Sequence, residues 1–342
     1  MKRAILNPAT GAIIKEINDS TAQEIEEALE SAATAFPVWS ELIPSERMKR
    51  LLDFADLLEK YADEICELEV SETGKPWSTM RDGEFPFGLD NLRFFAGAAR
   101  SLDGTGAGSF NHGYTSVLVK KPVGVVASIA PWNFPFIMAI WKIGPALAAG
   151  NTVIIKPAPQ TPSSTIKIVD LAKEIFPKGC LNVVLGDGEV AQQLVLDKRI
   201  SMISITGSSD SGKKVMKSAS ENVKRVHLEL GGKAPVIVRA DANLNQVAQA
   251  ISLACTYNSG QDCTAATRIY AHESIANELA EKMKEKMESI RFGDPKATST
   301  DIGPLISEKH RDLVHQKVTL AIKDGATLLT GGKIFDGKGF FY

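Results

Sequence analysis

The 342-residue sequence contains few cysteines, few aromatic residues and almost no net charge. Its four cysteines lie far apart, without a CxxC pair or the spacing of a metal site, which excludes a disulfide-rich scaffold and predicts reduced thiols in a cytoplasmic protein. A formal net charge of -2 gives no indication of binding to nucleic acid or to an anionic membrane. No window is apolar over the length that spans a bilayer, and no signal-peptide core precedes Asn7-Pro8.

The composition is typical of a soluble globular protein, with 44% hydrophobic and 23% charged residues. The chain is longer than one ordinary domain, so we expect two or three. Residues 21–100 have helical periodicity, residues 102–113 are rich in glycine, and Tyr114–Lys121 alternates as a strand does.

From Pro122 onward, short β-branched runs alternate with helical segments. The runs lie at Val123–Ile129, Thr152–Ile155, Asn182–Leu185, Met202–Ile205 and Pro235–Val238, and the helical segments at Phe136–Ala149, Pro162–Phe176, Glu189–Leu196 and Ser209–Ser218. This alternation predicts an α/β fold whose parallel sheet is covered by helices on both faces. Beyond Gly231 we expect a second α/β unit, with helices ending near Tyr257 and Ile290 and a strand at Thr267–Ala271.

Parallel sheets bind ligands at the carboxyl ends of their strands, so the polar residues that follow the strands are candidates for a site. Lys156 follows one strand, where a solvated strand-end lysine is the competing interpretation. Thr206-Gly207-Ser208 follows another strand and opens a helix, whose free N–H groups and positive dipole end can hold a phosphate. Taken alone, this segment is better explained as an ordinary helix cap by Ser208 or Ser209.

Three further residues have the chemistry of catalysis. Asn133 lies between two prolines in a rigid loop and could donate to an oxyanion, or could satisfy its own turn. Glu229 stands between two leucines and before Gly-Gly, so we expect a partly desolvated carboxyl suited to a general base; an exposed carboxylate on an alternating strand is the alternative. Cys263, in a polar loop after Gly260, is a candidate nucleophile, although a structural cysteine is the commoner case.

Taken together, these segments form an ordered series that resembles the aldehyde dehydrogenase superfamily. The series is Pro131-Trp132-Asn133-Phe134-Pro135, Lys156-Pro157, Thr206-Gly207-Ser208, Glu229-Leu230-Gly231-Gly232-Lys233 and Gly260-Gln261-Asp262-Cys263. The resemblance extends from Asn7-Pro8-Ala9-Thr10-Gly11 to the last residue. It is highly specific, because five motifs match in order and at the family's spacing.

The resemblance implies an NAD(P)-dependent oxidation of an aldehyde to a carboxylic acid through a thiohemiacetal and a thioester on Cys263. Asn133 and the backbone N–H of Cys263 would hold the oxyanion, and Glu229 would activate the hydrolytic water. Lys156 would hydrogen-bond the adenosine ribose of NAD. The other implied cofactor-binding residues are Ile129, Trp132, Gly186, Gly207, Ser208 and Leu230, and no metal is implied.

The family likeness also implies a domain plan. Residues 1–100 and 123–230 would form a Rossmann-like NAD(P)-binding domain, residues 101–122 an oligomerisation hairpin, and residues 231–342 part of a catalytic domain. Members of the family form homo-dimers or tetramers, so we expect a homo-oligomer.

The segments Arg93–Arg100 and Tyr257–Ala266 are similar to the aminobutyraldehyde dehydrogenase branch and suggest an ω-aminoaldehyde such as 4-aminobutyraldehyde. Asp262 could pair with the substrate ammonium, and Trp141 could add a cation–π contact. Betaine aldehyde, whose cation would also suit Asp262, is an alternative. Succinate semialdehyde is a weaker one, because Asp262 disfavours an anion, and Glu229 disfavours a relative that transfers the acyl group to coenzyme A.

Two departures from the family pattern affect these expectations. Pro159 stands where many relatives have a glutamate that binds the ribose diol, so NADP is possible as well as NAD. The chain also ends at Tyr342, whereas family members continue through a Glu-Val-Phe-Gly-Pro segment and the rest of the catalytic domain. We therefore expect full activity to require such a segment, and a catalytically silent fragment with a cofactor-binding fold is the alternative reading.

Overall fold

The computed structural model describes residues 1–102, 104 and 106–342; Asp103 and Thr105, within the segment predicted as a hairpin, lie outside the described residues. The chain forms two compact units. Unit 1 comprises Met1–Arg3, Asn18–Ile65 and Gly83–Glu229, and unit 2 comprises Ala4–Ile17, Cys66–Asp82 and Leu230–Tyr342. Among the described residues, no helix has both the length and the apolar character needed to cross a membrane.

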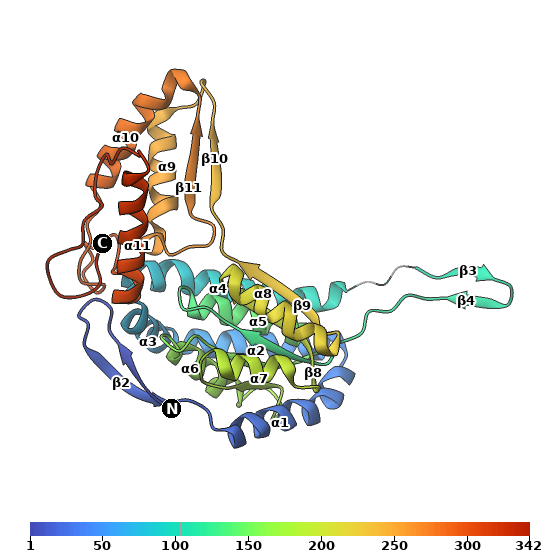
Figure 1. Ribbon diagram of the computed structural model, residues 1–342. Coiled ribbons are helices and arrows are strands. Elements are labelled where there is room, and N and C mark those ends of the chain that lie inside the picture. The colour runs from blue at the N-terminus through green and yellow to red at the C-terminus, as the bar shows by residue number, and fades with distance from the viewer. Residues whose placement is uncertain (103, 105) are drawn as a thin grey trace. The chain divides into compact units, whose positions relative to one another are not determined.

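A five-stranded sheet is the centre of unit 1 (Figure 1). Its strand order is β7-β6-β5-β8-β9, so that β9 forms one edge. The strands are β5 (Val125–Ile129), β6 (Thr152–Lys156), β7 (Leu181–Val183), β8 (Ile200–Gly207) and β9 (Arg225–Leu230). The pairs β5–β6, β5–β8 and β6–β7 are parallel, which confirms the predicted α/β fold with a parallel sheet.

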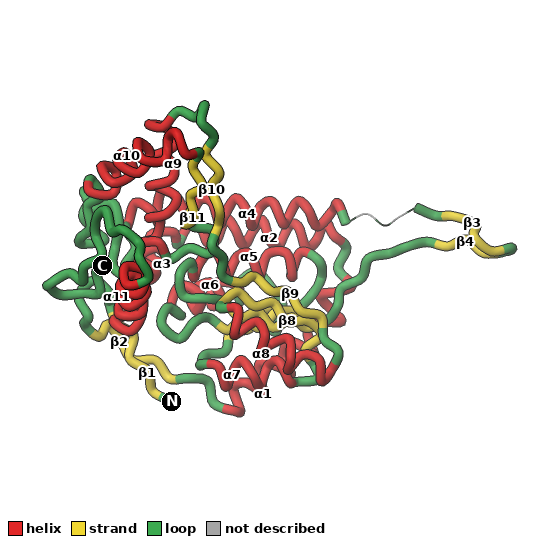
Figure 2. The backbone as a smooth tube through the Cα atoms, turned by 45° about the horizontal axis from the view of Figure 1, so that its top comes forward, coloured by secondary structure: helices red, strands yellow, loops and turns green. Residues whose placement is uncertain are grey.

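Helices cover both faces of this sheet (Figure 2). Unit 1 contains α1 (Ala22–Glu41), α2 (Pro44–Lys60), α4 (Phe85–Ala98), α5 (Pro135–Ala148), α6 (Ser163–Ala172), α7 (Gly188–Leu196) and α8 (Ser209–Ala219). Helices α1, α7 and α8 contact the sheet strands, and α5 packs on β5 and β6 with α4 and α2 beyond it. The boundary between the two units falls within α3 (Ala62–Thr73).

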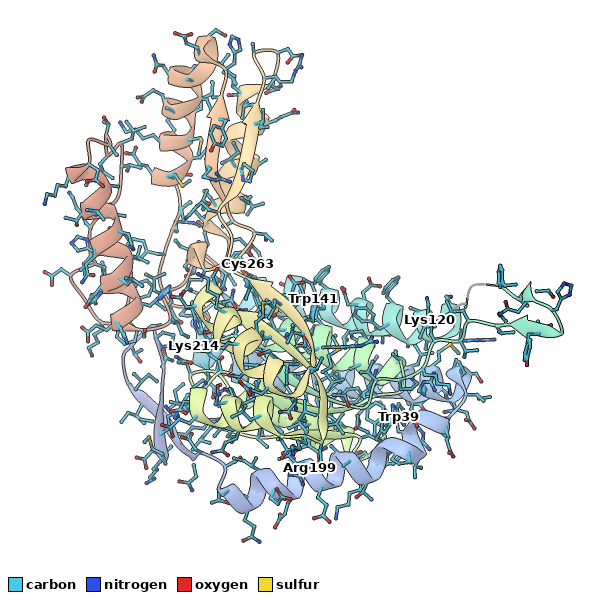
Figure 3. The ribbon with its side chains drawn as sticks, turned by 45° about the vertical axis from the view of Figure 1, so that its right-hand side comes forward. Trp39, Lys120, Trp141, Arg199, Lys214 and Cys263 are labelled. Atoms are coloured by element: carbon cyan, nitrogen blue, oxygen red, sulfur yellow. The ribbon has the colours of Figure 1, made fainter. Side chains whose placement is uncertain are left out.

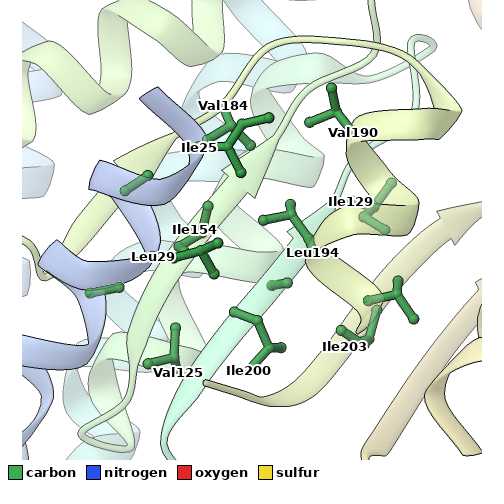
Figure 4. Close-up of a cluster of buried hydrophobic side chains, with 14 of the residues drawn as sticks. Ile25, Leu29, Val125, Ile129, Ile154, Val184, Val190, Leu194, Ile200 and Ile203 are labelled. Atoms are coloured by element: carbon green, nitrogen blue, oxygen red, sulfur yellow. The ribbon is translucent and has the colours of Figure 1, made fainter. Parts of the chain in front are cut away.

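The core between the sheet and helices α1, α7 and α8 is built from β-branched and leucine side chains (Figure 4). Ile25 and Leu29 of α1 belong to the same buried cluster as Val125 and Ile154 of the sheet, and Leu194 of α7 is fully buried. Val226 and Leu228 of β9 pack against the same cluster. Since side chains alternate along a strand, the neighbouring residues Arg225, His227 and Glu229 point to the other face of β9.

A two-stranded hairpin extends away from the sheet of unit 1 (Figure 1). Strand β3 (Gly108–Asn111) pairs antiparallel with β4 (Tyr114–Ser116). The second strand is shorter than the predicted Tyr114–Lys121, because Val117–Lys121 has no partner strand among the described residues and is exposed.

Unit 2 has a small parallel pair of strands, β10 (Ala234–Val238) and β11 (Ala266–Ala271), backed by helices. Its main helices are α9 (Leu244–Thr256), α10 (Ala276–Glu288) and α11 (Glu308–Lys323). The short helix η4 (Tyr257–Gly260) follows α9, and η5 (Glu273–Ile275) precedes α10. The π-helix η1 (Thr79–Glu84) lies between α3 and α4, at a boundary of the two units. Strands β1 (Lys2–Leu6) and β2 (Ile13–Asn18) pair with each other. A separate core contains Val238, Ala248, Ile251, Ala266 and Leu279.

The boundaries of the two units differ from those of the proposed domains. Residues 4–17 and 66–82 group with residues 230–342, although the sequence had placed them with the cofactor-binding part. The assignment of a cofactor-binding and a catalytic role to the two parts stays a prediction.

Candidate active site

The carboxyl ends of β5, β6 and β8 bring several of the predicted residues of unit 1 to one edge of the sheet. Ile129 pairs with Lys156 of β6 on one side and with Ile205 of β8 on the other. Trp132 and Asn133 follow β5, Gly207 ends β8 and Ser208 follows it, so these residues lie near the carboxyl ends of neighbouring strands.

The loop between β5 and α5 is fixed by its backbone. Ala130 N donates to Lys156 O at 3.0 Å, and Thr161 Oγ1 donates to the carbonyl of Trp132 at 3.4 Å. Pro135 then starts α5, where its missing N–H costs no hydrogen bond. Trp132 and Asn133 are half-buried in this rigid loop, and the role of Asn133 as an oxyanion donor stays a prediction.

Lys156 is the last residue of β6 and is only 4% exposed, so the interpretation as a solvated strand-end lysine was wrong. Its Nζ donates to the carbonyls of Pro157 at 2.9 Å and Gly186 at 2.8 Å. Desolvation by burial lowers the pKa of Lys156 to about 8. An ammonium has three N–H donors. Two of them are used in these bonds to described residues, so the third can bind a ligand.

The segment Thr206–Ser208 leads from β8 into α8 as predicted. Ser208 is the N-cap, and its Oγ accepts from Ser211 N at 3.1 Å, so the capping interpretation is correct for this residue. The same arrangement leaves further N–H groups of the first turn directed out of the helix. Capping and phosphate binding are therefore compatible, and the second stays a prediction.

Glu229 lies on the edge strand β9, and its side chain is 63% exposed. The expected partial desolvation of Glu229 was therefore wrong. Strand β9 has a neighbouring strand on one side only, and the Glu229 side chain lies on the face of β9 opposite to the apolar core. Glu229 Oε1 lies 3.1 Å from Nε2 of His227, two residues earlier on the same face of the strand.

A chain of hydrogen bonds continues from His227 into the interior of unit 1. His227 Nδ1 lies 3.0 Å from Ser204 Oγ on β8, and Lys142 Nζ of α5 donates to the same oxygen at 3.0 Å. Lys142 is 5% exposed, and desolvation lowers its pKa to about 7, against the opposing attraction of Glu229. Sequence reasoning missed this chain, although a single lysine within an apolar helix was a signal for it.

Cys263 belongs to unit 2 (Figure 3) and is exposed. Cys66 and Cys180 are buried, and Cys255 is half-buried. Burial raises the pKa of the Cys180 thiol to about 12 and also raises that of Cys255. Of the four thiols, Cys263 is thus the most accessible to an electrophile from solvent.

The loop before Cys263 is held in an unusual backbone conformation. Asn258 and Ser259 have φ of 49° and 59°, a left-handed conformation that is uncommon for residues other than glycine. Side chains pin the loop: Ser259 Oγ donates to Gly303 O at 2.7 Å, and Gln261 Oε1 accepts from Ile306 N at 2.9 Å. The structure therefore fixes the backbone that carries Cys263.

The Gly-Gly pair of the predicted Glu229–Lys233 motif approaches this loop. A Cβ added to Gly232 would lie 2.7 Å from the carbonyl oxygen of Cys263, closer than real Cβ contacts, whereas one added to Gly231 would meet nothing within 4 Å. Gly232 is thus required for close packing beside the nucleophile loop. Leu230, the last residue of β9, is half-buried, and its cofactor role stays a prediction.

The two candidate substrate residues have local partners. Asp262 Oδ1 accepts from Thr264 N at 2.8 Å and from Thr264 Oγ1 at 2.9 Å, so its carboxylate stabilises the turn at Cys263. Trp141 of α5 is 41% exposed and makes an edge contact with Phe87, with ring centroids 6.2 Å apart. The contacts of Asp262 and Trp141 with substrate therefore stay predictions.

Known proteins match this chain along its length. The profile of the aldehyde dehydrogenase family covers residues 2–342. Betaine aldehyde dehydrogenase of Vibrio vulnificus (strain YJ016) is 40% identical over 96% of this chain and 68% of its own length. Lactaldehyde dehydrogenase of Escherichia coli (strain K12) is 39% identical over 99% of this chain and 71% of its own.

Solved structures of similar proteins have the same fold as this chain. A lactaldehyde dehydrogenase superposes with a TM-score of 0.97 at 37% identity, covering 100% of this chain and 72% of its own. PnpE in complex with nicotinamide adenine dinucleotide has a TM-score of 0.96 at 39% identity, covering 100% and 71%. The resemblance stated from the motifs is confirmed: the chain belongs to the aldehyde dehydrogenase family.

Proposed function

We propose that the chain oxidises an aldehyde bearing a cationic nitrogen to its carboxylic acid, with Cys263 as nucleophile and NAD as hydride acceptor. The observation that carries the proposal is the exposed thiol of Cys263 on a pinned, strained loop, at the position of the family's motif. A fixed backbone beside a nucleophile limits the reorganisation needed for attack.

The proposed steps follow from the residues of the motif series. The thiolate of Cys263 adds to the aldehyde carbon, and the amide of Asn133 and the N–H of Cys263 stabilise the resulting oxyanion. Loss of hydride from that carbon leaves a thioester. Glu229 then removes a proton from water, which attacks the thioester carbon and releases the acid and the thiol. NAD, when bound, supplies the acceptor for the hydride.

The carboxyl-terminal edge of the unit 1 sheet fits a dinucleotide. Lys156 keeps one N–H donor for a ribose hydroxyl, and the first turn of α8 offers N–H groups and the positive end of an 11-residue helix to a pyrophosphate. Ile129, Trp132, Gly186 and Leu230 complete the proposed cofactor set. Pro159 brings no carboxylate to this edge, so a 2′-phosphate is not repelled and NADP remains the alternative cofactor.

For the substrate we propose an ω-aminoaldehyde such as 4-aminobutyraldehyde. Asp262, next to the nucleophile, and the partly exposed ring of Trp141 can each attract a substrate cation. Betaine aldehyde fits the same chemistry, and the name of the Vibrio relative supports it equally.

We propose further that the chain forms a cytoplasmic homo-oligomer through the β3–β4 hairpin. Phe110 and Tyr114 of the hairpin are 80% and 72% exposed, and Val117, Leu118 and Val119 behind it are exposed as well. Apolar side chains gathered on one projecting segment are typical of a protein–protein contact. Light scattering of the wild-type chain and a Phe110→Ser, Tyr114→Ser variant would test this: an unchanged mass would refute it.

The function is tested by following NADH and NADPH formation with 4-aminobutyraldehyde, betaine aldehyde and succinate semialdehyde. We expect turnover that Cys263→Ala abolishes and that the matched Cys255→Ala variant retains. We expect Asp262→Asn to raise KM for the two cations about tenfold, as for the loss of one charged partner, and to lower KM for the anion, which the carboxylate repels. Turnover that survives Cys263→Ala would refute the proposal, and a preference for succinate semialdehyde would refute the substrate class.

A further inference from the structure

The hydrogen-bonded chain on the edge of the unit 1 sheet joins a buried lysine to the proposed general base. It runs from Lys142 Nζ to Ser204 Oγ at 3.0 Å, from Ser204 Oγ to His227 Nδ1 at 3.0 Å, and from His227 Nε2 to Glu229 Oε1 at 3.1 Å. The four residues come from α5, β8 and β9, so the fold and not the local sequence brings them together.

The order of donors in this chain follows from its first member. A lysine ammonium can only donate, so Ser204 Oγ accepts from Lys142 and has its own O–H left to give. The ring nitrogen nearest to Ser204 is Nδ1 of His227, which accepts that proton when it is unprotonated. A neutral imidazole then carries its hydrogen on Nε2, which faces Glu229.

We infer that His227 is a positioning residue for Glu229: its Nε2–H, directed by Ser204 and Lys142, holds one carboxylate oxygen and leaves the other to act as base. The inference rests on the proposed function, because it assigns a role through Glu229. Its physical basis is the 63% exposure of the Glu229 side chain, since an exposed glutamate on an edge strand otherwise samples several rotamers.

Charged groups lie on more than one side of His227. Lys142 lies behind it on α5, Glu229 faces it on β9, and Arg225 shares the outer face of β9. Burial lowers the pKa of Lys142 to about 7, so the donor end of the chain changes its charge near neutral pH. When Lys142 is neutral, its amine can also accept a hydrogen bond from Ser204. The direction of donation along these hydrogen bonds is then no longer fixed.

The kinetic test separates acylation from hydrolysis of the thioester. In His227→Ala we expect a normal burst of NADH and a deacylation rate reduced about tenfold, less than the ~10²-fold or greater loss expected for removal of a general base. His227→Gln places an amide N–H near the position of Nε2 and should restore most of the rate. His272→Ala, which removes another histidine hydrogen-bonded to a serine, is the matched control and should leave the rate unchanged.

The spectroscopic test needs no turnover. In protein labelled with ¹⁵N-histidine, the ring of His227 should show the Nε2–H tautomer, and Ser204→Ala should convert it to a mixture. A pH profile of deacylation should lose its steepest change in the same Ser204→Ala variant, whereas a merely structural role would lower the rate equally at each pH.

The outcomes distinguish this inference from the proposed function. Absence of a Cys263-dependent burst in the wild-type chain would count against the proposed function. A normal burst with unchanged deacylation in His227→Ala, or a His227 tautomer that Ser204→Ala does not alter, would overturn the positioning role. Thermal melting of each variant shows whether a loss of rate reflects unfolding.

Discussion

Replacing Lys142 by methionine should stabilise the protein, and by an amount that depends on pH. Lys142 is 5% exposed in the apolar helix α5, and its pKa falls from 10.5 to about 7 because burial disfavours the ammonium. Methionine has a similar unbranched side chain without the charge, so it can fill the same space. Replacement of a buried charge by an apolar side chain of similar volume is often stabilising.

The size of the effect follows from the two pKa values. A fall of the pKa of Lys142 from 10.5 to about 7 corresponds to roughly 5 kcal/mol of penalty below pH 7, where both the folded and the unfolded chain are protonated. Above pH 7 the folded chain releases this proton first, the unfolded chain binds more protons, and stability rises with pH. By pH 9 the penalty should be roughly 2 kcal/mol, a change of about 3 kcal/mol.

Loss of the Lys142 donor leaves Ser204 short of one hydrogen bond, which costs about 1 kcal/mol and does not depend on pH. We therefore expect Lys142→Met to raise the free energy of unfolding by about 4 kcal/mol at pH 6 and by about 1 kcal/mol at pH 9. Urea unfolding followed by tryptophan fluorescence measures this, because the buried Trp39 lies in unit 1. Lys173→Met, at a lysine that is 70% exposed, is the control. A difference from wild type that stays constant from pH 6 to pH 9 would refute the reasoning.

Two further substitutions test the local geometry. Gly232→Ala should slow alkylation of Cys263 and aldehyde turnover at least fivefold, since the added Cβ would lie 2.7 Å from the Cys263 carbonyl; Gly231→Ala, with open space around it, should not, and equal rates in the two variants would contradict this. Lys156→Met should weaken NAD binding about tenfold, the value of one charge-assisted hydrogen bond, as measured by fluorescence titration; an unchanged affinity would remove Lys156 from the cofactor site.

Local patterns in the sequence predicted most of the secondary structure. The helices expected at Glu189–Leu196 and Ser209–Ser218 lie at Gly188–Leu196 and Ser209–Ala219. These boundaries were predictable because an aspartate and a serine cap the helices, and caps are set by neighbours in sequence. Parallel pairing of the strands was predictable for another reason: it follows from the alternation of strands and helices along the sequence.

What the sequence could not supply depends on contacts between distant elements. Glu229 was expected to be desolvated by its leucine neighbours, but exposure at a strand edge depends on the order of strands in the sheet. For Lys156 the error was the opposite, because a solvated side chain was considered and the side chain is buried. One of the carbonyls that it binds, that of Gly186, lies 30 residues away in the sequence. The close approach of Gly232 to Cys263 was likewise hidden, although the Gly-Gly pair itself was visible in the sequence.

The cost of burying Lys142 and the positioning of Glu229 are two consequences of one arrangement. An apolar side chain at position 142 would favour stability, but Ser204 would lose the donor that directs its own O–H toward His227. Residues that lower stability yet orient a reactive group are typical of functional sites. We therefore expect Lys142→Met to be both more stable and slower in deacylation, and to share the mixed His227 tautomer of Ser204→Ala. A variant that gained stability and kept both the rate and the tautomer would separate the buried charge from the chemistry.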